Sequence, residues 1–389
     1  MESFCGILES IKKQGLFRSL EPSRARGKFI ERGDRKYYNF TTNDYLGVSS
    51  DLDLQKEFLA SLGGGEFLMS AVSSRLLGGD NPAFGALERS FEGLFAAAGA
   101  RKSCLLFNGG YHANTAVLPA LASSGDAVFC DRLVHASLID ALRLSGARFF
   151  RYAHNDCAHL EALLRQNRAK FARAFILTES VFSMDGDCAD IAELVRLKKT
   201  YDALLYVDEA HSFGALGKEG LGVCADSGLA GDVDFIMFTL GKAVASQGAV
   251  VATSPELRGL LVNRARPFVF TTAMPPICAL WSAFVFEKIR AMDARRGHLA
   301  EISRRLRGSL GGLEVLGSTH IAPVVVGSSQ AATEISRRLL ERGYCAGAVR
   351  YPTVPKNSAR IRISLNAKME DAEIDAFADC LKELLQNEN

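Results

Sequence analysis

The sequence lacks several patterns that identify whole classes of protein. Its nine cysteines are scattered and include no C-x-x-C pair, which favours reduced thiols over a disulfide framework. The longest apolar stretch, residues 277–286, is far too short to cross a bilayer. The first residues carry an early charge and no apolar core of a signal peptide. We therefore expect a cytoplasmic protein that does not enter a membrane.

Charge of one sign is also missing. The 46 basic and 44 acidic residues are well mixed, and no basic stripe with interleaved aromatic residues occurs, so nucleic-acid binding is not expected. The chain has no H-E-x-x-H motif and no Cys/His set with ligand spacing, so no metal site is expected. A G-x-S-x-G elbow is absent as well, which leaves a Ser-His-Asp hydrolase without its usual sequence signal.

The chain does have the length and apolar content of a globular protein with one large and one smaller domain. It has 389 residues, of which 48% are hydrophobic and 23% charged. Between about residues 80 and 255, short apolar runs alternate with helical stretches, and a helix is expected to begin at Asn81-Pro82. This order predicts a mainly parallel sheet flanked by helices. The seven predicted strands are Cys104–Phe107, Ala127–Cys130, Arg148–Tyr152, Phe175–Thr178, Leu204–Val207, Phe235–Leu240 and Ala249–Ala252.

The two ends of the chain differ from this central pattern. Residues 1–45 begin with an amphipathic helix and continue as a charged, turn-rich arm. Beyond Pro275-Pro276 a long helical region rich in Arg and Leu runs to about residue 310, followed by a strand–helix–strand–strand–helix order. The expected fold class is therefore α/β, with an N-terminal arm (1–45), a large domain with a seven-stranded sheet (46–275) and a smaller α+β C-terminal domain (276–389).

Reactive side chains follow two of the predicted strands. Lys242 comes directly after Thr239-Leu240-Gly241 and is the only charged residue in the stretch 235–255. Asp208-Glu209-Ala210-His211 follows the preceding predicted strand. Open α/β sheets place their sites at the carboxyl ends of the strands. An isolated amine suits Schiff-base chemistry and a neighbouring acid can face a pyridinium nitrogen, so the pair points to pyridoxal phosphate.

The letters D-E-A-H also occur in nucleotide-driven helicases. That function requires an upstream G-x-x-x-x-G-K-[ST] phosphate loop. The only Gly-Lys near a strand end is Gly241-Lys242, which lies downstream, is followed by Ala243 and has Ile236 where the first glycine belongs. A helicase is excluded on these three counts, whereas a merely structural role of the two carboxylates is the remaining alternative to a pairing with Lys242.

Three further segments follow predicted strands. The turn Asn108–Asn114 contains two glycines and opens a helix, so it offers backbone N–H groups to a phosphate, with Thr239 as a hydroxyl partner. His135 follows another strand, where its ring could pack flat on a cofactor; a structural histidine is the alternative. His154 is expected to cap the helix that follows it.

Taken in their order, these motifs resemble those of the α-oxoamine synthases. The resemblance implies a fold-type I pyridoxal phosphate-dependent transferase that joins an amino acid to an acyl thioester with loss of carbon dioxide. It also implies a homodimer with sites at the subunit interface. The resemblance runs from about residue 35 to the C-terminus and is carried by Thr42–Gly47, His154–Asp156, Thr178–Asp187, Val207–His211 and Thr239–Lys242.

Within the family, two C-terminal segments narrow the resemblance. Arg350–Pro355 followed by Ala359–Arg362 looks most like the 8-amino-7-oxononanoate synthases of biotin synthesis, which use L-alanine and a pimeloyl thioester. A glycine C-acetyltransferase (2-amino-3-ketobutyrate CoA ligase) carries similar segments and is the alternative. The acyl carrier, coenzyme A or a carrier protein, is left open. A catalytically silent binding subunit is disfavoured because the lysine, the aspartate and both histidines are present.

The resemblance assigns cofactor roles to individual residues. Lys242 would hold the cofactor as an imine, Asp208 would face the pyridinium nitrogen and His135 would stack on the ring. The other implied contacts surround the cofactor's hydroxyl and its phosphate: His211 and Ser183 for the hydroxyl, and Gly110, Tyr111 and Thr239 for the phosphate.

The resemblance also assigns residues to the substrates. Arg362 would hold the amino-acid carboxylate, Asn43 would lie near the reacting groups and Thr353 would contact substrate. Arg18, in the N-terminal arm, would meet the acyl substrate. One segment departs from the family's pattern: Ala71–Gly79 has fewer glycines than the family's corresponding stretch, which in this fold approaches the site of the partner subunit.

Overall fold

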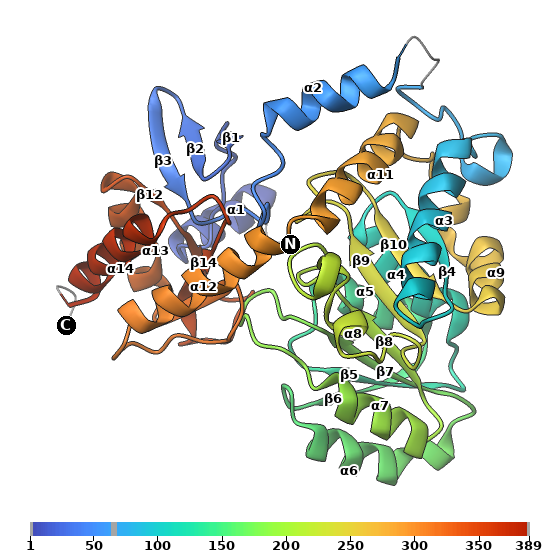
Figure 1. The fold of residues 1–389 in the computed structure, drawn as a ribbon. Helices are drawn as coiled ribbons and strands as arrows, with labels where there is room; N and C mark the ends of the chain where they lie inside the picture. Colours follow the sequence, from blue (N-terminus) through green and yellow to red (C-terminus); the bar gives the residue numbers. More distant parts are fainter. Residues whose placement is uncertain (1–2, 64–67, 387–389) are drawn as a thin grey trace. The chain divides into compact units, whose positions relative to one another are not determined.

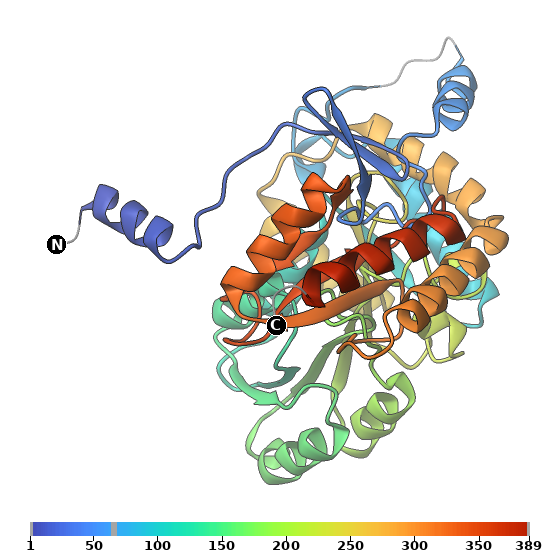
Figure 2. The ribbon, with the colours of Figure 1, turned by 90° about the vertical axis from the view of Figure 1, so that its left-hand side faces the viewer.

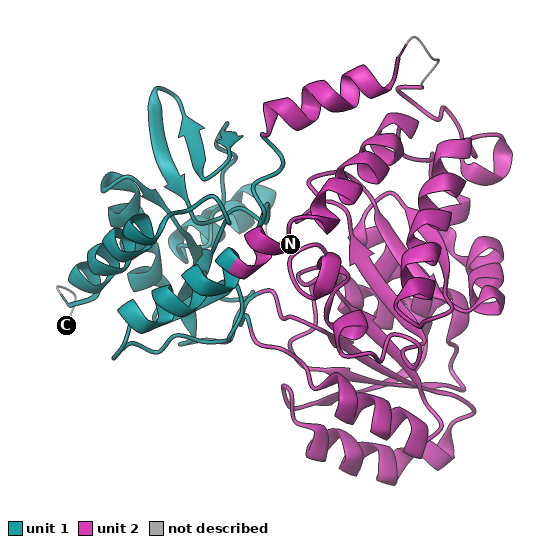
Figure 3. Cartoon of the chain, viewed as in Figure 1, with its two compact units in different colours: residues 1–50, 184–186, 298–389 teal, residues 51–183, 187–297 magenta. Residues whose placement is uncertain are grey.

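The computed structural model describes residues 3–63 and 68–386 and groups the chain into two compact units, coloured in Figure 3. Unit 1 comprises residues 1–50, 184–186 and 298–389, and unit 2 comprises residues 51–183 and 187–297. The boundary at residues 297 and 298 falls inside helix α12 (Asp293–Ser309). The domain limits expected after residues 45 and 275 stay predictions.

Unit 2 is built on a seven-stranded sheet with the strand order β4-β10-β9-β8-β7-β5-β6 (Figure 1). β10 runs antiparallel to both of its neighbours, and the pairs from β9 to β6 are parallel. The predicted α/β fold with a mainly parallel sheet is confirmed. The seven strands are β4 (Ser103–Phe107), β5 (Ala127–Asp131), β6 (Arg148–Tyr152), β7 (Ala174–Glu179), β8 (Leu204–Asp208), β9 (Phe235–Thr239) and β10 (Ala249–Thr253).

The inner strands of this sheet form because their residues are apolar on both faces. β5, β7, β9 and β10 are buried at every residue, as expected for a sheet covered on both sides. The helices and short 3-10 turns of this unit are α2 (Leu52–Ser61), η1 (Arg75–Leu77), α3 (Pro82–Ala97), α4 (Gly110–Leu121), α5 (Ala136–Ser145), α6 (Cys157–Asn167), η2 (Arg168–Lys170), α7 (Ile191–Thr200), η3 (Lys218–Gly220), α8 (Val223–Asp226), α9 (Pro255–Arg264), α10 (Arg266–Val269) and α11 (Pro276–Arg290).

Helix α3 begins where the sequence predicts. The Asn81 side chain accepts a hydrogen bond from the backbone N–H of Ala83, and Pro82 occupies the first turn, where its missing N–H leaves no bond unmade. The long helical region expected to run to about residue 310 is two helices, α11 and α12, which are separated at residues 291–292.

The strand directions bring reactive segments to one edge of the sheet. β4 points the same way as β9 because both are antiparallel to β10, and β5 to β9 are parallel to one another. We call the edge where these strands end the carboxyl edge. The last residues of its strands are Phe107, Asp131, Tyr152, Glu179, Asp208 and Thr239, because β6 is parallel to β5.

Unit 1 contains two small sheets, with the strand orders β1-β2-β3-β12 and β11-β14-β13. The predicted strand–helix–strand–strand–helix order is present as β11, α13, β13, β14 and α14. Besides the N-terminal helix and the end of α12, its elements are β1 (Arg24–Arg26), β2 (Phe29–Arg32), β3 (Arg35–Asn39), β11 (Ile321–Gly327), α13 (Ser329–Glu341), β12 (Tyr344–Cys345), β13 (Gly347–Val349), β14 (Ala359–Ser364) and α14 (Asp371–Gln386).

The N-terminal part of unit 1 is only partly as expected. The predicted amphipathic helix is present as α1 (Phe4–Lys13), which has no buried residue; Figure 2 shows it standing away from the strands of its unit. Strands β1 to β3 were not predicted, because the many charged residues at their exposed positions interrupt the apolar alternation. Throughout residues 3–63 and 68–386, every helix is too short or too polar to span a bilayer.

Candidate active site

A cavity of about 200 Å³ lies at the carboxyl edge of unit 2. It brings together Lys242 and Asp208, which the sequence places on two different strand ends. Seven of the predicted site residues line it: Gly110, Tyr111, His135, Asp208, His211, Thr239 and Lys242. The remaining lining residues are Asn114, Ser137, Glu179, Ala210 and Met237.

Lys242 reaches the cavity from a tightly bonded turn after β9. Its Nζ lies 2.6 Å from Nε2 of His211, a residue of the turn after β8 that is buried. The backbone N–H of Ala245 donates to the carbonyl of Lys242 at 2.8 Å, and Ala245 itself has a φ of 51°. The indole N–H of Trp281 donates to the carbonyl of Ala245 at 3.0 Å and so holds this unusual backbone in place.

The carboxylate of Asp208 is buried and is oriented from two sides. Its Oδ1 accepts from the backbone N–H of Ala210 at 2.9 Å, and its Oδ2 accepts from Nδ2 of Asn114 at 2.8 Å. The hydroxyl of Tyr206 donates to Oδ1 of Asn114 at 2.6 Å, which fixes the direction of the amide. A single orientation of the carboxylate results.

Glu179, at the end of β7, is a second buried carboxyl group in the same cavity. Its Oε1 accepts from the backbone N–H of His135 at 2.5 Å. Burial raises the pKa of Glu179 well above its ordinary value; the nearby charge of Asp208 adds to this, whereas the charge of Lys242 opposes it. Two carboxyl groups, those of Asp208 and Glu179, therefore face the same cavity.

His135 is the N-cap of α5. Its Nδ1 accepts from the backbone N–H of Ser137 at 3.3 Å and lies 2.7 Å from the Ser137 hydroxyl, so this nitrogen carries no proton. Partial loss of hydration lowers the pKa of His135, and the charge of Lys242 lowers it further against the opposing effect of Asp208. The ring is thus neutral and fixed in orientation.

The N-terminus of α4 offers an anion-binding arrangement. No side chain caps this helix at Gly109, so the N–H groups of its first turn are available to a ligand. Thr239 lies beside it: a Cβ on Gly110 would be 3.8 Å from the Cβ of Thr239. Tyr111 is half exposed at the cavity mouth, and its hydroxyl donates to the carboxylate of Asp140.

The other predicted site residues lie outside this cavity lining. Ser183 is in the turn after β7 and is not among the described residues that line the cavity. In unit 1, Nη2 of Arg362 lies 3.4 Å from Oδ1 of Asn43, which also accepts from the Tyr45 hydroxyl at 3.2 Å. Thr353 and Arg18 are exposed in separate segments of that unit.

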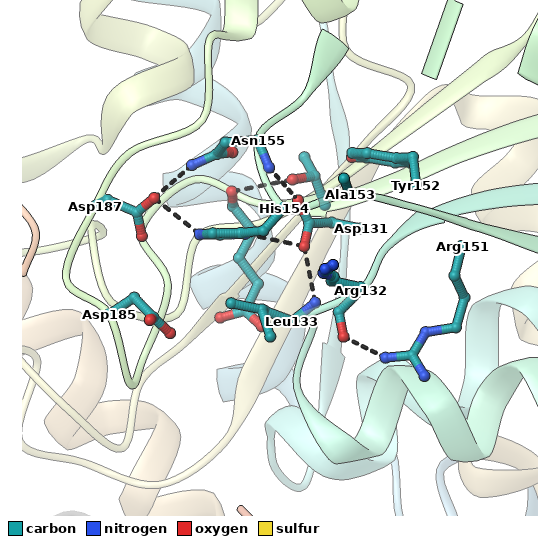
Figure 4. Close-up of polar contacts among 12 residues, drawn as sticks. Asp131, Arg132, Leu133, Arg151, Tyr152, Ala153, His154, Asn155, Asp185 and Asp187 are labelled. Atoms are coloured by element: carbon teal, nitrogen blue, oxygen red, sulfur yellow. Dashed lines mark hydrogen bonds and ion pairs between the residues drawn. The ribbon is translucent and has the colours of Figure 1, made fainter. Parts of the chain in front are cut away.

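The expectation that His154 caps the following helix is wrong. Asp156 caps α6, since its side chain accepts from the backbone N–H of His159 at 2.8 Å. An aspartate outcompetes the histidine because its short side chain reaches the first-turn N–H groups directly. The ring of His154 lies instead between Asp131 and Asp187 (Figure 4).

Comparison with known proteins connects this geometry to a family. Residues 35–381 match the family described as aminotransferase class I and II, a range that contains the whole cavity. The chain belongs to this aminotransferase class I and II family. It is 43% identical over 381 residues to a protein of Haemophilus influenzae named putative 8-amino-7-oxononanoate synthase, with 97% of this chain and 99% of the relative covered.

Solved structures agree with the family. The 8-amino-7-oxononanoate synthase of Francisella tularensis has a TM-score of 0.75 and 26% identity, with 90% of this chain and 98% of that chain covered. A structure described as SPT with PLP has a TM-score of 0.87 and 25% identity, with 98% and 97% covered. The resemblance to the α-oxoamine synthases is confirmed: the chain is a fold-type I transferase, an enzyme whose cofactor is pyridoxal 5'-phosphate.

Five lining residues of this family member were not predicted from the sequence, and two of them, Asn114 and Glu179, carry polar side chains that bond predicted site residues. Asn114 and Glu179 both stand inside segments that the sequence singles out, Asn108–Asn114 and Thr178–Asp187. Asn114 lies one turn into α4 and Glu179 is the last residue of β7. Because side chains at these places face the carboxyl edge, their position at a strand end or in the first turns of the following helix was the available signal.

Proposed function

We propose that this chain is a pyridoxal phosphate-dependent 8-amino-7-oxononanoate synthase. It condenses L-alanine with a pimeloyl thioester and releases carbon dioxide and the free thiol carrier, a reaction of biotin biosynthesis. The observation that carries the proposal is that Lys242 and Asp208 line one cavity with the uncapped end of α4. Full-length similarity to proteins named putative 8-amino-7-oxononanoate synthase supports the substrate choice.

The cavity residues fit the cofactor in chemical type. The amine of Lys242 would hold it, Asp208 would face its ring nitrogen and the neutral ring of His135 would stack on it. When bound, the cofactor supplies a conjugated ring that absorbs the electrons of a carbanion at the substrate α-carbon. The residues assigned to its hydroxyl and phosphate are His211 and Ser183, and Gly110, Tyr111 and Thr239, respectively.

The chain's own groups would supply binding and proton transfer. The guanidinium of Arg362 binds the amino-acid carboxylate with two parallel hydrogen bonds, and Asn43 beside it contributes to the orientation of the reacting groups. The Nζ of Lys242 would be the base that takes the α-proton of the amino acid. Thr353 contacts the substrate, and Arg18 meets the acyl substrate.

A second copy of this chain is the proposed partner. Several large apolar side chains are exposed in the segment 68–77 of unit 2 and at Phe270. The backbone N–H of Ala273 donates to the carbonyl of Ser73 and so joins the two parts of the chain. An apolar strip of this kind is typical of a protein interface. We propose that a second copy of the chain covers this strip in a homodimer. Analytical ultracentrifugation tests this, and the expected result is a particle of twice the mass of the chain. The exposed residues are Leu68, Met69, Val72, Leu76, Leu77 and Phe270.

The proposed location is the cytoplasm. All nine cysteines are free thiols in the structure, which fits a reducing compartment. Amino acid and acyl thioester are then the small-molecule partners, and neither a membrane nor a nucleic acid has a role in the proposed reaction.

Product identification tests the function directly. The purified protein with pyridoxal phosphate is incubated with L-alanine or glycine and with pimeloyl-CoA, a pimeloyl-carrier protein or acetyl-CoA, and products are identified by mass spectrometry. The proposal expects 8-amino-7-oxononanoate from alanine and a pimeloyl donor. Product from glycine and acetyl-CoA alone would instead establish a glycine C-acetyltransferase.

A further inference from the structure

Asp131, His154 and Asp187 form a cluster, here called the His154 triad, at the outer carboxyl edge of unit 2 (Figure 4). Nδ1 of His154 lies 3.0 Å from Oδ1 of Asp131, and Nε2 lies 2.9 Å from Oδ2 of Asp187. Asp131 is fully buried, and the His154 side chain is 21% exposed. One imidazole ring is therefore held between two carboxylates.

Both ring nitrogens must donate in this arrangement. A neutral imidazole has a single N–H, so its other nitrogen would place a lone pair against a carboxylate oxygen. Burial of the ring opposes the charged form, but the hydrogen bonds to Asp131 and Asp187 outweigh it and raise the pKa of His154 to about 10. The ring of Phe182 lies edge-on to the His154 ring with 4.4 Å between the ring centroids, and the amide of Asn155 donates to Asp187 at 2.6 Å.

One side of the triad leads to His135. Oδ1 of Asp131 also accepts from the backbone N–H of Leu133 at 2.8 Å, which shapes the turn between β5 and α5. Oδ2 of Asp131 accepts from the backbone N–H of Asn155 at 2.8 Å, which joins this turn to the loop after β6. His135 is the last residue of the turn, and its backbone N–H donates to the carboxyl group of Glu179.

The other side of the triad leads to Ser183. The backbone N–H of Phe182 donates to the carbonyl of Asp187 at 3.1 Å, and Asn155 Nδ2 donates to the carbonyl of Cys188 at 3.2 Å. Phe182 is buried against the His154 ring and precedes Ser183 in the chain. The loop after β7 is thus bonded to the same imidazole as the loop after β5.

We propose that His154 is a positioning residue of the cofactor site: a cation between Asp131 and Asp187 that sets the loops carrying His135 and Ser183. Without that cation, two carboxylates face one another at the junction of three loops and repel. The loops that carry His135 and Ser183 are then no longer held in the positions that the cofactor ring requires. The inference rests on the proposed cofactor roles of His135 and Ser183.

The charge state is tested on the wild-type protein without cofactor. Selective ¹³C labelling of the histidine rings and an NMR titration from pH 5 to pH 10 report each ring, with His154→Gln identifying the signal. We expect the His154 signal to keep its charged shift at pH 8.5. A ring that titrates near pH 6.5, the ordinary histidine value, overturns the proposal.

The positioning role is tested by cofactor affinity, measured by equilibrium dialysis with pyridoxal phosphate. His154→Gln can donate to only one of the carboxylates and is expected to weaken binding by about tenfold. Asp187→Asn, which removes one carboxylate and leaves the other, is a milder variant for the case that His154→Gln does not fold. His159→Gln is the matched control, since the His159 ring accepts only from the backbone N–H of Ala153 and contacts no carboxylate in the triad.

The outcomes separate this inference from the proposed function. Unchanged affinity in folded His154→Gln and Asp187→Asn overturns the positioning role, even if the wild type makes 8-amino-7-oxononanoate. About tenfold weaker affinity in His154→Gln, a smaller loss in Asp187→Asn and unchanged affinity in His159→Gln support the positioning role whatever product the wild type makes.

Discussion

Two histidines on neighbouring loops of the carboxyl edge have opposite electrostatic environments. In the cavity, partial loss of hydration and the charge of Lys242 lower the pKa of His135, and only Asp208 opposes them. At the outer edge, two carboxylates raise the pKa of His154 to about 10. The same side chain is therefore a neutral ring on one loop and a cation on the neighbouring loop.

The cavity and the outer part of the carboxyl edge differ in whether their ionisable groups bond one another. Asp131, His154 and Asp187 bond one another, so both ring nitrogens of His154 find their partners within the cluster. Around the cavity, the amine of Lys242 and the carboxyl groups of Asp208 and Glu179 face a common space. Ionisable groups that converge on one space are those that a bound group would meet, which is typical of active sites.

Removing the cavity's amine is expected to have the largest effect. Lys242→Ala removes both the covalent attachment of pyridoxal phosphate and the base, so turnover should fall by about 10³-fold or more. The visible absorbance of the bound cofactor should vanish with it. Circular dichroism checks that the fold is retained. Unchanged absorbance and turnover in Lys242→Ala would contradict the assignment of Lys242 to the site.

Neutralising the cavity's carboxylate comes next. Asp208→Asn keeps the shape of the side chain but lacks the charge that stabilises a protonated ring nitrogen, so kcat should fall by about 10²-fold. Steady-state kinetics measure this. Glu209→Gln is the matched control: it changes the adjacent buried carboxyl group, which lies outside the cavity lining, and should change kcat less than about twofold. Equal losses in both variants would contradict a specific role for Asp208.

The charge of His154 should make the free energy of unfolding depend on pH. The pKa of His154, about 10 in the folded chain, exceeds the unfolded value of roughly 6.5, so its stabilisation is complete below pH 6.5 and is lost as pH rises towards 10. Between pH 6 and pH 10 the wild type should lose on the order of 2 kcal/mol more than His154→Gln. Urea unfolding at both pH values measures the difference. An equal loss of unfolding free energy in the wild type and in His154→Gln would contradict a raised pKa of His154.

The smallest expected effect concerns Glu209, a buried carboxyl group outside both clusters. Burial raises its pKa to about 7, against a backbone hydrogen bond from Cys224 that lowers it. A raised carboxyl pKa stabilises the fold at low pH and loses this contribution as pH rises through 7. From pH 6 to pH 8.5, Glu209→Gln should gain about 1 kcal/mol relative to the wild type in urea unfolding. A constant difference across this range would contradict the raised pKa.

The sequence predicts the sheet and the strand ends well, for a physical reason. Each central strand is an apolar run short enough to be distinguished from a helix, and polar residues follow at its carboxyl end. Lys242 and Asp208 therefore stand out from the local sequence alone. Strands β1 to β3 do not, because charged side chains cover their exposed positions.

Pairings across loops could not be predicted in the same way. His154 looks like a helix cap in the sequence because Asp131 and Asp187 are distant along the chain, and only folding brings them to its two nitrogens. Glu179 and Asn114 were overlooked for a related reason: their partners, His135 and Asp208, lie on other strand ends. Side-chain partners of this kind depend on strand order, which local sequence does not contain.

The central claim is that Lys242 is the amine that carries the cofactor in this cavity. Treating the protein with pyridoxal phosphate and then borohydride fixes the cofactor to the lysine that holds it, and mass spectrometry of the proteolytic peptides locates the modification. The account predicts a single modified peptide containing Lys242. Modification of another lysine, or of none, would contradict it.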